Sequence, residues 1–262
     1  MSKQRSVYQL TVADIQPLSP NLCRFVLQGD GLGDFPDDYE GGYVKLVLPR
    51  PGDEGQLVDV DKSIKRSYTV RAFDRAVRRL TLEFAGHDAE GPAMRWANTA
   101  EVGTEVSVVG PGPVKMLDPT ADWFLLAGDM TALPAIAVNL SRLPKHARGY
   151  ALIEIVSDQD RQSYDIPKAM DVQWIVNPDP QPDKSPLDDA IRKVDWLPGQ
   201  VSAWVACEFN AMLAIRRYFR DELELSKDDM YISSYWKIGS TDEQHKNAKR
   251  GAAEAIPRIG QS

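Results

Sequence analysis

The stretch Lys65-Arg66-Ser67-Tyr68-Thr69-Val70-Arg71 carries more information about the fold than any other part of this sequence. It alternates as a β-strand does, with Tyr68 and Val70 on one face. Such a strand suits a flat aromatic ligand with a phosphate tail, because Tyr68 can stack, Thr69 can hydrogen-bond and Arg66 can bind a pyrophosphate. The alternative is an exposed basic edge strand. The heptapeptide alone favours the alternative, because short motifs recur by chance; the rest of the chain favours the ligand.

The composition is that of a globular protein with one large domain or two modest ones. The chain has 262 residues, of which 43% are hydrophobic, and its net charge of -7 argues against nucleic-acid binding. Cys23 and Cys207 stand far apart among apolar neighbours and are expected to be buried thiols, as suits a reducing cytosol. The sequence begins without an apolar signal region and contains no membrane-spanning run. We therefore expect a cytoplasmic protein with no membrane partner. A monomer is the expected oligomeric state.

Up to about Asp118 the chain has the pattern of an all-β domain. Short alternating segments are separated by Gly, Pro and Asp, which indicates a small closed antiparallel barrel. Lys45 is expected on the strand face opposite Leu46. The expected strands are residues 7–15, 22–27, 43–49, 65–71, 79–85 and 105–109, with a turn at 17–21, a loop at 29–42 and an acidic, mobile loop at 51–61.

One short helix is expected within the barrel domain, over residues 91–98. Pro92 suits a first helical turn, and the free N–H groups there are a natural seat for a pyrophosphate. His87 and Asp88 lie just before it, within reach of an adenine or ribose. The alternative is that the helix only plugs the barrel, with Trp96 as its packing residue.

Beyond Pro119 the pattern changes to alternating apolar strands and helices. Residues 123–127 form a continuous apolar run, typical of a strand buried on both faces. A helix follows at 132–143, with Thr131 as its expected cap. Alternation of this kind predicts a doubly wound parallel sheet that binds ligands at the carboxyl ends of its strands. Further strands are expected at 151–156, 172–176, 201–207 and 230–234, helices at 187–194 and 209–223, and the ligand near residues 128–131, 157–160 and Glu208.

We expect three parts: residues 1–118 as the barrel domain, 119–240 as the α/β domain and 241–262 as a helical tail. The tail holds Lys246, Lys249, Arg250 and Arg258. A solvated helix is the default interpretation of such a charge run, and the alternative is a role in attracting an anionic ligand.

The order of these motifs resembles that of the siderophore-interacting proteins, a family of flavin-dependent ferric-siderophore reductases within the ferredoxin reductase-like superfamily. The resemblance extends from about residue 7 to 250. It is carried by residues 43–46, 66–71, 87–96, 125–135, 207–208, 215–218 and 235–239.

The resemblance implies FAD bound by the barrel and NADH or NADPH met by the second domain. Tyr68, Thr69 and Thr131 would be the catalytic residues. Tyr235 and Trp236 would shield the flavin, although a core aromatic pair at a domain interface is the alternative. The residues implied to bind FAD are Arg66, Ser67, Tyr68, Thr69, His87, Asp88, Gly91, Pro92, Ala93, Trp96, Thr131, Ala132, Tyr235 and Trp236.

Two positions depart from the family pattern. Met94 replaces a small hydroxyl residue expected to help bind phosphate, and Met130 replaces a carboxylate. The first weakens one cofactor contact that backbone N–H groups can still make. The second puts in doubt an acidic role at that position and favours Thr131 as the functional residue.

The expected reaction is hydride transfer from NAD(P)H to the flavin, followed by single-electron transfer to Fe(III) in a docked siderophore. The chelator carries the iron, so no protein metal ligands are needed, and oxygen-rich chelators hold Fe(II) less tightly. An acidic chelate would need local positive charge. The candidate cations are Lys45, Arg142, Lys237, Lys246 and Arg250, of which Lys45 lies on a matched barrel strand.

Several electron donors are compatible with the sequence. Asp158 and Glu208 are candidates for the nicotinamide cofactor, since Asp158 and Asp160 could accept from a ribose hydroxyl and would repel a 2′-phosphate. Arg161 alongside weakens that argument, so NADH is only slightly favoured, and ferredoxin remains a possible donor. Two other functions stay open: a general NAD(P)H-flavin reductase that serves a protein acceptor, and a ferric-chelate carrier without turnover.

Overall fold

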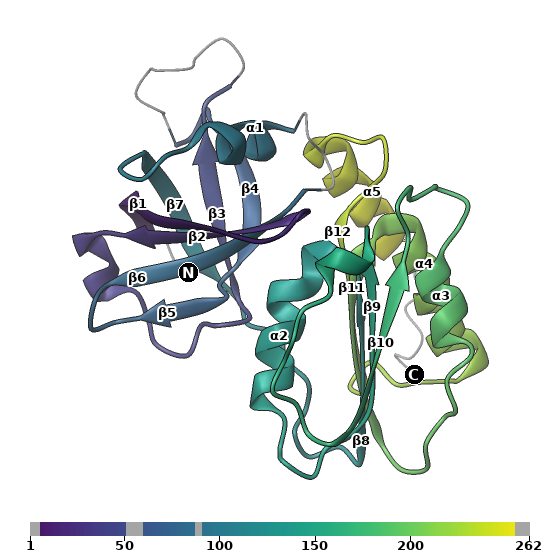
Figure 1. Ribbon diagram of the computed structural model, residues 1–262. Coiled ribbons are helices and arrows are strands. Elements are labelled where there is room, and N and C mark those ends of the chain that lie inside the picture. The colour runs from purple at the N-terminus through teal and green to yellow at the C-terminus, as the bar shows by residue number, and fades with distance from the viewer. Residues whose placement is uncertain (1–5, 51–59, 87–90, 255–262) are drawn as a thin grey trace, which may run out of the picture.

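The structure, a computed structural model, describes residues 6–50, 60–86 and 91–254. It has two parts, an antiparallel barrel and an α/β unit built on a parallel sheet (Figure 1). His87, Asp88, Arg258 and most of the expected acidic loop at 51–61 lie outside the described residues. Among the helices that are described, none has the length and apolar character needed to cross a membrane.

The barrel is closed because one stretch of chain forms both edges of its sheet. The seven antiparallel segments follow the order β4-β3-β7-β1-β2-β6-β5, and only Val70 and Arg71 separate β4 from β5. The Arg71 N–H donates to the Thr81 carbonyl at 2.9 Å, which carries the pairing across the join. The expected closed barrel is therefore confirmed. Its strands are β1 (Ser6–Ser19), β2 (Leu22–Gln28), β3 (Tyr43–Leu48), β4 (Ile64–Thr69), β5 (Ala72–Asp74), β6 (Arg79–Ala85) and β7 (Glu105–Gly112).

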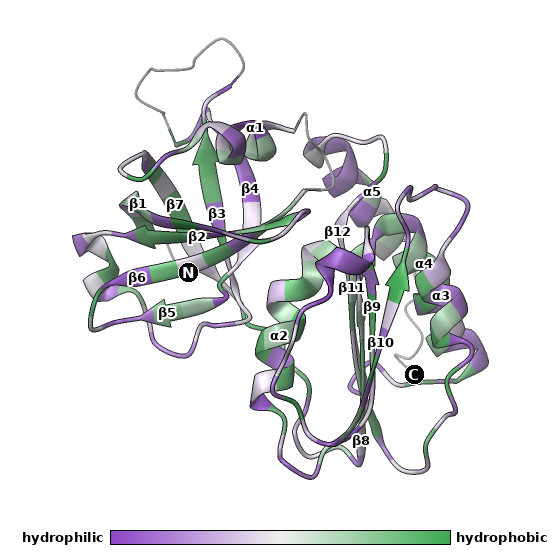
Figure 2. Ribbon diagram, viewed as in Figure 1, coloured by the Kyte–Doolittle hydropathy of each residue, from purple (hydrophilic) through white to green (hydrophobic). Residues whose placement is uncertain are grey.

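The barrel core explains the different compositions of β3 and β4. β3 is largely hydrophobic and β4 largely hydrophilic in Figure 2. Leu46 on β3 is fully buried, whereas Ser67 on β4 is exposed. Helix α1 (Pro92–Thr99) packs Trp96 against the barrel core, as the plug interpretation expects.

The first barrel hairpin is tighter than the expected turn at 17–21. β1 continues through Pro17, which pairs with Cys23, and ends at Ser19 opposite Leu22. A register shift between Pro17 and Ser19 marks a bulge, a position where a strand tolerates proline. The prediction of a five-residue turn was wrong for this reason.

The second sheet is parallel throughout and has the order β10-β9-β8-β11-β12. Along β8, Phe124 and Leu126 pack on the side of α2, while Trp123 and Leu125 pack on the side of α3 and α4. The continuous apolar run thus fills both faces, and the predicted doubly wound sheet is confirmed. The elements are β8 (Trp123–Gly128), α2 (Leu133–Arg142), β9 (Arg148–Ile155), β10 (Ala169–Val176), α3 (Pro186–Ile191), β11 (Val201–Glu208), α4 (Phe209–Arg217), β12 (Met230–Trp236) and α5 (Asp242–Glu254), with short turns η1 (Asp30–Asp34), η2 (Met130–Ala132), η3 (Asp158–Asp160) and η4 (Tyr218–Glu222).

Two local predictions are corrected by the structure. The Thr131 side chain does not cap α2. A 3-10 turn precedes this helix, and the Asp129 carboxylate caps that turn by accepting from the Thr131 N–H. Aspartate is the stronger acceptor for this purpose. Cys207 is buried as expected, whereas Cys23 is only partly buried, and both are free thiols.

A buried carboxylate fastens the barrel to the α/β unit. The Asp160 side chain is fully buried and accepts hydrogen bonds from the Ser19 hydroxyl at 2.6 Å and from the Asn21 backbone and side-chain amides at 3.1 and 2.9 Å. It also accepts from the Ser157 backbone N–H within η3. The β1–β2 hairpin is thereby bound to the turn that follows β9.

We expect the Asp160→Ala substitution to lower the free energy of unfolding by about 3 kcal/mol, because it leaves the partly buried donors of Ser19 and Asn21 without their acceptor. Chemical denaturation followed by tryptophan fluorescence measures this. The control is Asp158→Ala, which removes a carboxylate that is 72% exposed and ion-paired with Arg161; its cost should stay within about 1 kcal/mol. Equal losses in the two variants would contradict the role of Asp160.

Candidate functional site

The aromatic side chains expected to contact the cofactor meet on a common ring inside the barrel. Tyr68 stacks on Phe84 with 4.0 Å between ring centroids and 28° between planes, and Trp96 lies 5.7 Å from Phe84. Burial raises the pKa of the Tyr68 hydroxyl, and the nearby Arg66 charge partly offsets the rise. Phe84 lies on the strand expected at residues 79–85 but had no expected role; its position between Tyr68 and Trp96 depends on barrel closure.

The N-terminus of α1 lacks a side-chain cap. The helix begins at Gly91, which has no side chain to accept from the first turn, whereas α3 and α4 are capped by Ser185 and Glu208. Ala93 is buried there, and Met94 packs against the barrel core. Met94 is therefore a packing residue, at a position where the family resemblance led us to expect a small hydroxyl side chain.

The barrel strand β4 reaches the α/β unit through its last residue. Thr69 is 7% exposed, and its side chain is a hydrogen-bonding partner of the Tyr235 hydroxyl at the end of β12. Burial raises the pKa of Tyr235, which the hydrogen bond with Thr69 partly offsets. The structure thus brings Thr69 and Tyr235 together at the boundary between the two parts, while Tyr68 packs inside the barrel.

The carboxylate of Asp129, which lies within the expected ligand region at 128–131 but was not singled out there, organises the start of the α/β unit. Asp129 is 7% exposed and accepts from the Thr131 N–H at 2.9 Å, the Thr131 hydroxyl at 2.5 Å and the Trp236 indole N–H at 2.7 Å. Met130 and Ala132 are buried in the core beside α2, so their side chains pack and do not reach solvent. The sequence signal that could have identified Asp129 is its position directly after an apolar strand.

Gly128 permits this turn because no larger residue fits at the end of β8. A Cβ atom there would lie 2.7 Å from the Ala206 carbonyl oxygen and 2.8 Å from the Ala132 Cβ. The turn η2 can therefore fold close over β11. This close approach carries Asp129 toward the end of β12.

Three carboxylates gather at the carboxyl ends of β8, β9 and β11. Burial is the main cause that raises the pKa of Glu154 to about 7; Asp129 and Glu208 raise it further, while the hydrogen bond from the Asn177 side chain at 3.0 Å lowers it. Glu154 was not singled out from the sequence, although a glutamate within an apolar strand is an available signal. Its position at the carboxyl edge depends on the parallel topology.

The residues expected at the nicotinamide cofactor lie at this edge, with different surroundings. Glu208 accepts from the Asn210 and Ala211 N–H groups of α4 and from the Ile238 N–H, so its oxygens bind backbone amides. The Asp158 side chain is exposed and ion-paired with Arg161 at 2.7 Å.

The candidate substrate cations fall in separate places. Lys45 pairs across strands with Ser67 on β4, and the Lys237 ammonium lies 4.5 Å from the centre of the Phe209 ring. Arg142 lies at the far end of α2 from Thr131, a distance of about 15 Å along a ten-residue helix, and pairs with Glu40 at 2.9 Å. Lys246 and Arg250 are exposed on α5, one helical turn apart.

Helix α5 is docked at the end of β12. The buried His245 ring lies 2.5 Å from the Ser234 hydroxyl, and the Lys249 ammonium donates to the Ser234 carbonyl at 2.7 Å. The helix is largely hydrophilic in Figure 2. The expected tail is thus a helix with one face bound to the α/β unit, and its exposed cations stand near the end of β12.

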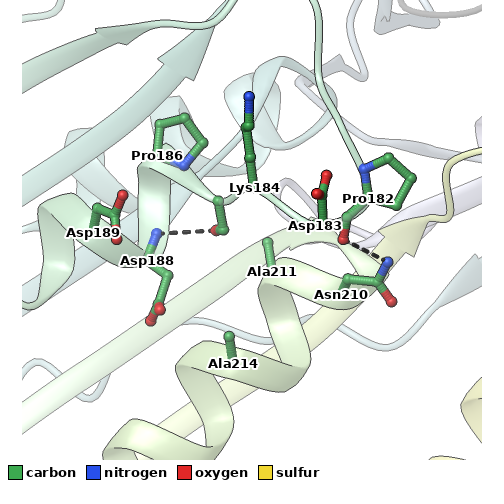
Figure 3. Close-up of a pocket in the computed structure, with 10 residues that line it drawn as sticks. Pro182, Asp183, Lys184, Pro186, Asp188, Asp189, Asn210, Ala211 and Ala214 are labelled. Carbon is green, nitrogen blue, oxygen red and sulfur yellow. Dashed lines mark hydrogen bonds between the residues drawn. The ribbon is translucent and has the colours of Figure 1, made fainter.

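A surface pocket of about 440 Å³ lies between the N-terminal ends of α3 and α4 (Figure 3). The Asn210 side chain donates to the Pro182 carbonyl at 3.0 Å and holds the overlying loop in place. Carboxylates dominate its charge, which is unfavourable for a phosphate-bearing ligand. The pocket is lined by Pro182, Asp183, Lys184, Ser185, Pro186, Asp188, Asp189, Asn210, Ala211 and Ala214.

Comparison with known families covers both parts of the chain. Residues 11–115 match the family described as "Siderophore-interacting FAD-binding domain", and residues 121–239 match the family described as "Siderophore-interacting protein". The two matches correspond to the barrel and to the α/β unit.

Individual relatives extend over nearly the whole chain. An uncharacterized protein of Mycobacterium tuberculosis is 35% identical, over 96% of this chain and 97% of the relative. Ferric vibriobactin reductase ViuB of Vibrio cholerae is 33% identical, over 87% of this chain and 88% of the relative. The crystal structure of the siderophore-interacting protein SipS from Aeromonas hydrophila aligns with a TM-score of 0.86 at 31% identity, covering 96% of this chain and 99% of SipS.

We expect Glu154→Gln to stabilise the protein at pH 8 but not at pH 4.5. The folded-state pKa of Glu154 is raised to about 7 from 4.5, so its contribution is favourable when protonated and is lost as the pH rises between these values. The difference in the free energy of unfolding between the variant and the wild type should grow by up to about 3 kcal/mol as the pH rises through this interval. Denaturant unfolding at several pH values measures it.

The matched control for Glu154→Gln is Asp171→Asn on the exposed face of β10. The free energy of unfolding of this variant should depend on pH in the same way as that of the wild type. A Glu154→Gln curve parallel to that of the wild type would contradict the raised pKa.

Proposed function

The chain belongs to the siderophore-interacting protein family, and from this we propose that it is an FAD-dependent reductase that releases Fe(II) from a ferric siderophore with electrons from NADH. The observation that carries the proposal is the contact between Thr69 and Tyr235, because it joins the expected flavin strand to the end of the expected donor domain. We also propose a cytoplasmic location, which the two free thiols support.

The described residues offer an aromatic ring, a nearby positive charge and a helix N-terminus, each of which suits FAD. Tyr68 offers an aromatic ring beside the Arg66 charge, as a flavin and its pyrophosphate require. The N-cap position of α1 is occupied by Gly91, which has no side chain to accept from the first turn of the helix. Helix N-termini with this property are suited to phosphate. Arg66, Ser67, Gly91, Pro92 and Ala93 would hold the phosphate side, and Trp96 the adenosine side.

FAD would supply the conversion between two-electron and one-electron transfer when bound. The protein would contribute orientation and exclusion of water. Thr69 would hydrogen-bond the ring edge, Thr131 would face it from the α/β side, and Tyr235 and Trp236 would cover it. Because Thr131 and Trp236 are both bound to Asp129, their positions relative to each other are set in advance.

The substrate side of the proposal rests on charge. The chain has a net charge of -7, so an acidic chelate needs a local positive region. Lys45 lies beside Ser67 on the outer face of β3 and β4, and Lys237 is oriented by the Phe209 ring. We propose these two with Lys246 and Arg250 for the chelate. Arg142 is not included, because its guanidinium pairs with Glu40 at the other end of α2.

The test is an anaerobic spectrum of the purified protein with FAD, to which NADH, NADPH or reduced ferredoxin is added, followed by a ferric siderophore and an Fe(II)-trapping dye. The expected result is bleaching by NADH and recovery of colour as Fe(II) appears, with two Fe(II) for each NADH, since a hydride carries two electrons. Bleaching without Fe(II) would favour a reductase with another acceptor. Failure to take up FAD would refute the proposal.

We expect Arg66→Ala to weaken FAD binding at least about tenfold, because a charge-assisted contact with the pyrophosphate is lost. Fluorescence titration of the apoprotein with FAD measures the dissociation constant. The control is Arg79→Ala on β6, an exposed arginine whose side chain donates to Gln28 at 3.3 Å. It should bind FAD within twofold of the wild type, and an unchanged affinity in Arg66→Ala would count against the pyrophosphate role.

We expect NADH to reduce the holoprotein with a kcat/KM at least about tenfold higher than NADPH, because the carboxylates at the ends of β9 and β11 repel a 2′-phosphate. Stopped-flow reduction with each donor measures the ratio. Asp158→Asn should lower this NADH/NADPH ratio, while Asp171→Asn should not, because Asp171 lies near the amino end of β10, away from the carboxyl ends of the strands. A preference for NADPH, or a ratio unaffected by Asp158→Asn, would overturn this specificity.

A further inference from the structure

The end of β12 contains a β-bulge that sets the directions of two aromatic side chains. Cys207 on β11 pairs with Ser234, but the next residue, Glu208, pairs with Trp236, so Tyr235 is the extra residue. A bulge of this kind bends the strand and redirects its side chains. Tyr235 points to the barrel residue Thr69, while the Trp236 indole reaches Asp129.

Asp129 connects two strands that are not neighbours. It follows β8, and β11 lies between β8 and β12 in the sheet. Its Oδ1 accepts from the Thr131 N–H and hydroxyl at 2.9 and 2.5 Å, and its Oδ2 accepts from the Trp236 Nε1–H at 2.7 Å. One buried carboxylate therefore fixes Thr131 and Trp236 relative to each other.

The backbone that follows is held by a second carboxylate. Glu208 Oε1 accepts from the Ile238 N–H at 3.2 Å, while Oε2 accepts from the first turn of α4. Lys237, which lies between Trp236 and Ile238, places its ammonium group over the Phe209 ring. Because the backbone of this segment has its own support, the contact with Asp129 acts mainly on the Trp236 ring.

The arrangement requires a carboxylate at position 129. Donors approach both of its oxygens, and an ionised carboxyl group offers acceptors on both sides. An asparagine has the same shape but one oxygen and one NH2 group. Whichever way it turns, the amide places a donor against either the Trp236 N–H or the Thr131 N–H, so one side of the contact is lost.

We propose that Asp129 is a positioning residue that holds the Trp236 indole and the Thr131 hydroxyl in the geometry required for electron entry from the donor. This inference rests on the proposed function, in which Thr131 and Trp236 flank the flavin. Asp129 acts through these two residues and has no assigned contact with the reactants. The bulge at Tyr235 is the structural reason why the indole is within its reach.

The first test uses the apoprotein and is independent of catalysis. The fluorescence of Trp236 is obtained as the difference between the wild type and Trp236→Phe, and again as the difference between Asp129→Asn and the double variant. We expect Asp129→Asn to shift the Trp236 emission to the red and to increase its quenching by acrylamide at least twofold. An unchanged Trp236 signal would overturn the inference whether or not the protein proves to be a reductase.

The second test uses the holoprotein and separates electron entry from electron exit. Asp129→Asn should slow reduction by NADH at least tenfold, with FAD affinity and reoxidation by the ferric siderophore within twofold of the wild type. The double variant with Trp236→Phe should be no slower than Asp129→Asn alone, because the opposing donor is gone. Additive losses, or a reduction rate unaffected in Asp129→Asn, would refute the positioning role.

Two further variants keep the test decisive. If Asp129→Asn does not fold, Trp236→Phe alone removes the same hydrogen bond at a partly exposed site and should slow reduction by NADH at least fivefold. Trp174→Phe is the matched control, since Trp174 is a partly buried indole on β10, the opposite edge of the sheet. NADH should reduce the Trp174→Phe holoprotein at the wild-type rate. Equal effects of the two tryptophan variants on this rate would contradict the proposal.

Discussion

Closure of the barrel through Val70 and Arg71 is the constraint on which the arrangement of the site depends. Arg66 and Ser67 lie on opposite faces of β4, so this strand could not be covered on both faces in a flat sheet without burying the Arg66 charge. In the closed barrel it lies at one edge of the pairing order and passes directly into β5 at the other. Tyr68 then packs inward on Phe84, while Thr69 points to the α/β unit. The backbone of β4 is therefore hydrogen-bonded in the sheet, while its side chains remain available to a ligand.

The α/β unit depends on a different interaction, the burial of carboxylates among N–H and O–H donors. Asp160 binds the first barrel hairpin, Asp129 binds Thr131 and Trp236, and Glu208 binds the first turn of α4 and the backbone after β12. A buried carboxylate without such partners would be strongly unfavourable. Each therefore forces its donors into place, and the cost of burial becomes a source of geometric precision. Glu154 has fewer donors, which agrees with its raised pKa.

Much of the fold could be predicted from local pattern. The strands from 79 to 85 and from 123 to 127, the helix that begins with Pro92 and the alternation beyond Pro119 all appear in the structure, because each is determined by the periodicity of its own residues. Predictions that depended on competition between neighbours failed. Thr131 does not cap α2, because it lies within the 3-10 turn that Asp129 caps, and Pro17 stayed in its strand because a bulge accommodates it.

The sequence by itself determined the two kinds of sheet, the residues that face their cores and the motifs that resemble a flavin reductase family. These properties follow from side-chain periodicity and from short-range backbone preferences, which act over a few residues. Only the tertiary structure decided that Phe84 joins Tyr68 to Trp96, that Arg142 pairs with Glu40 away from Thr131, and that Asp129 reaches across β11 to Trp236. Each of these contacts joins segments distant in the chain, and their distances depend on strand order and on a single bulge. No local pattern encodes that information.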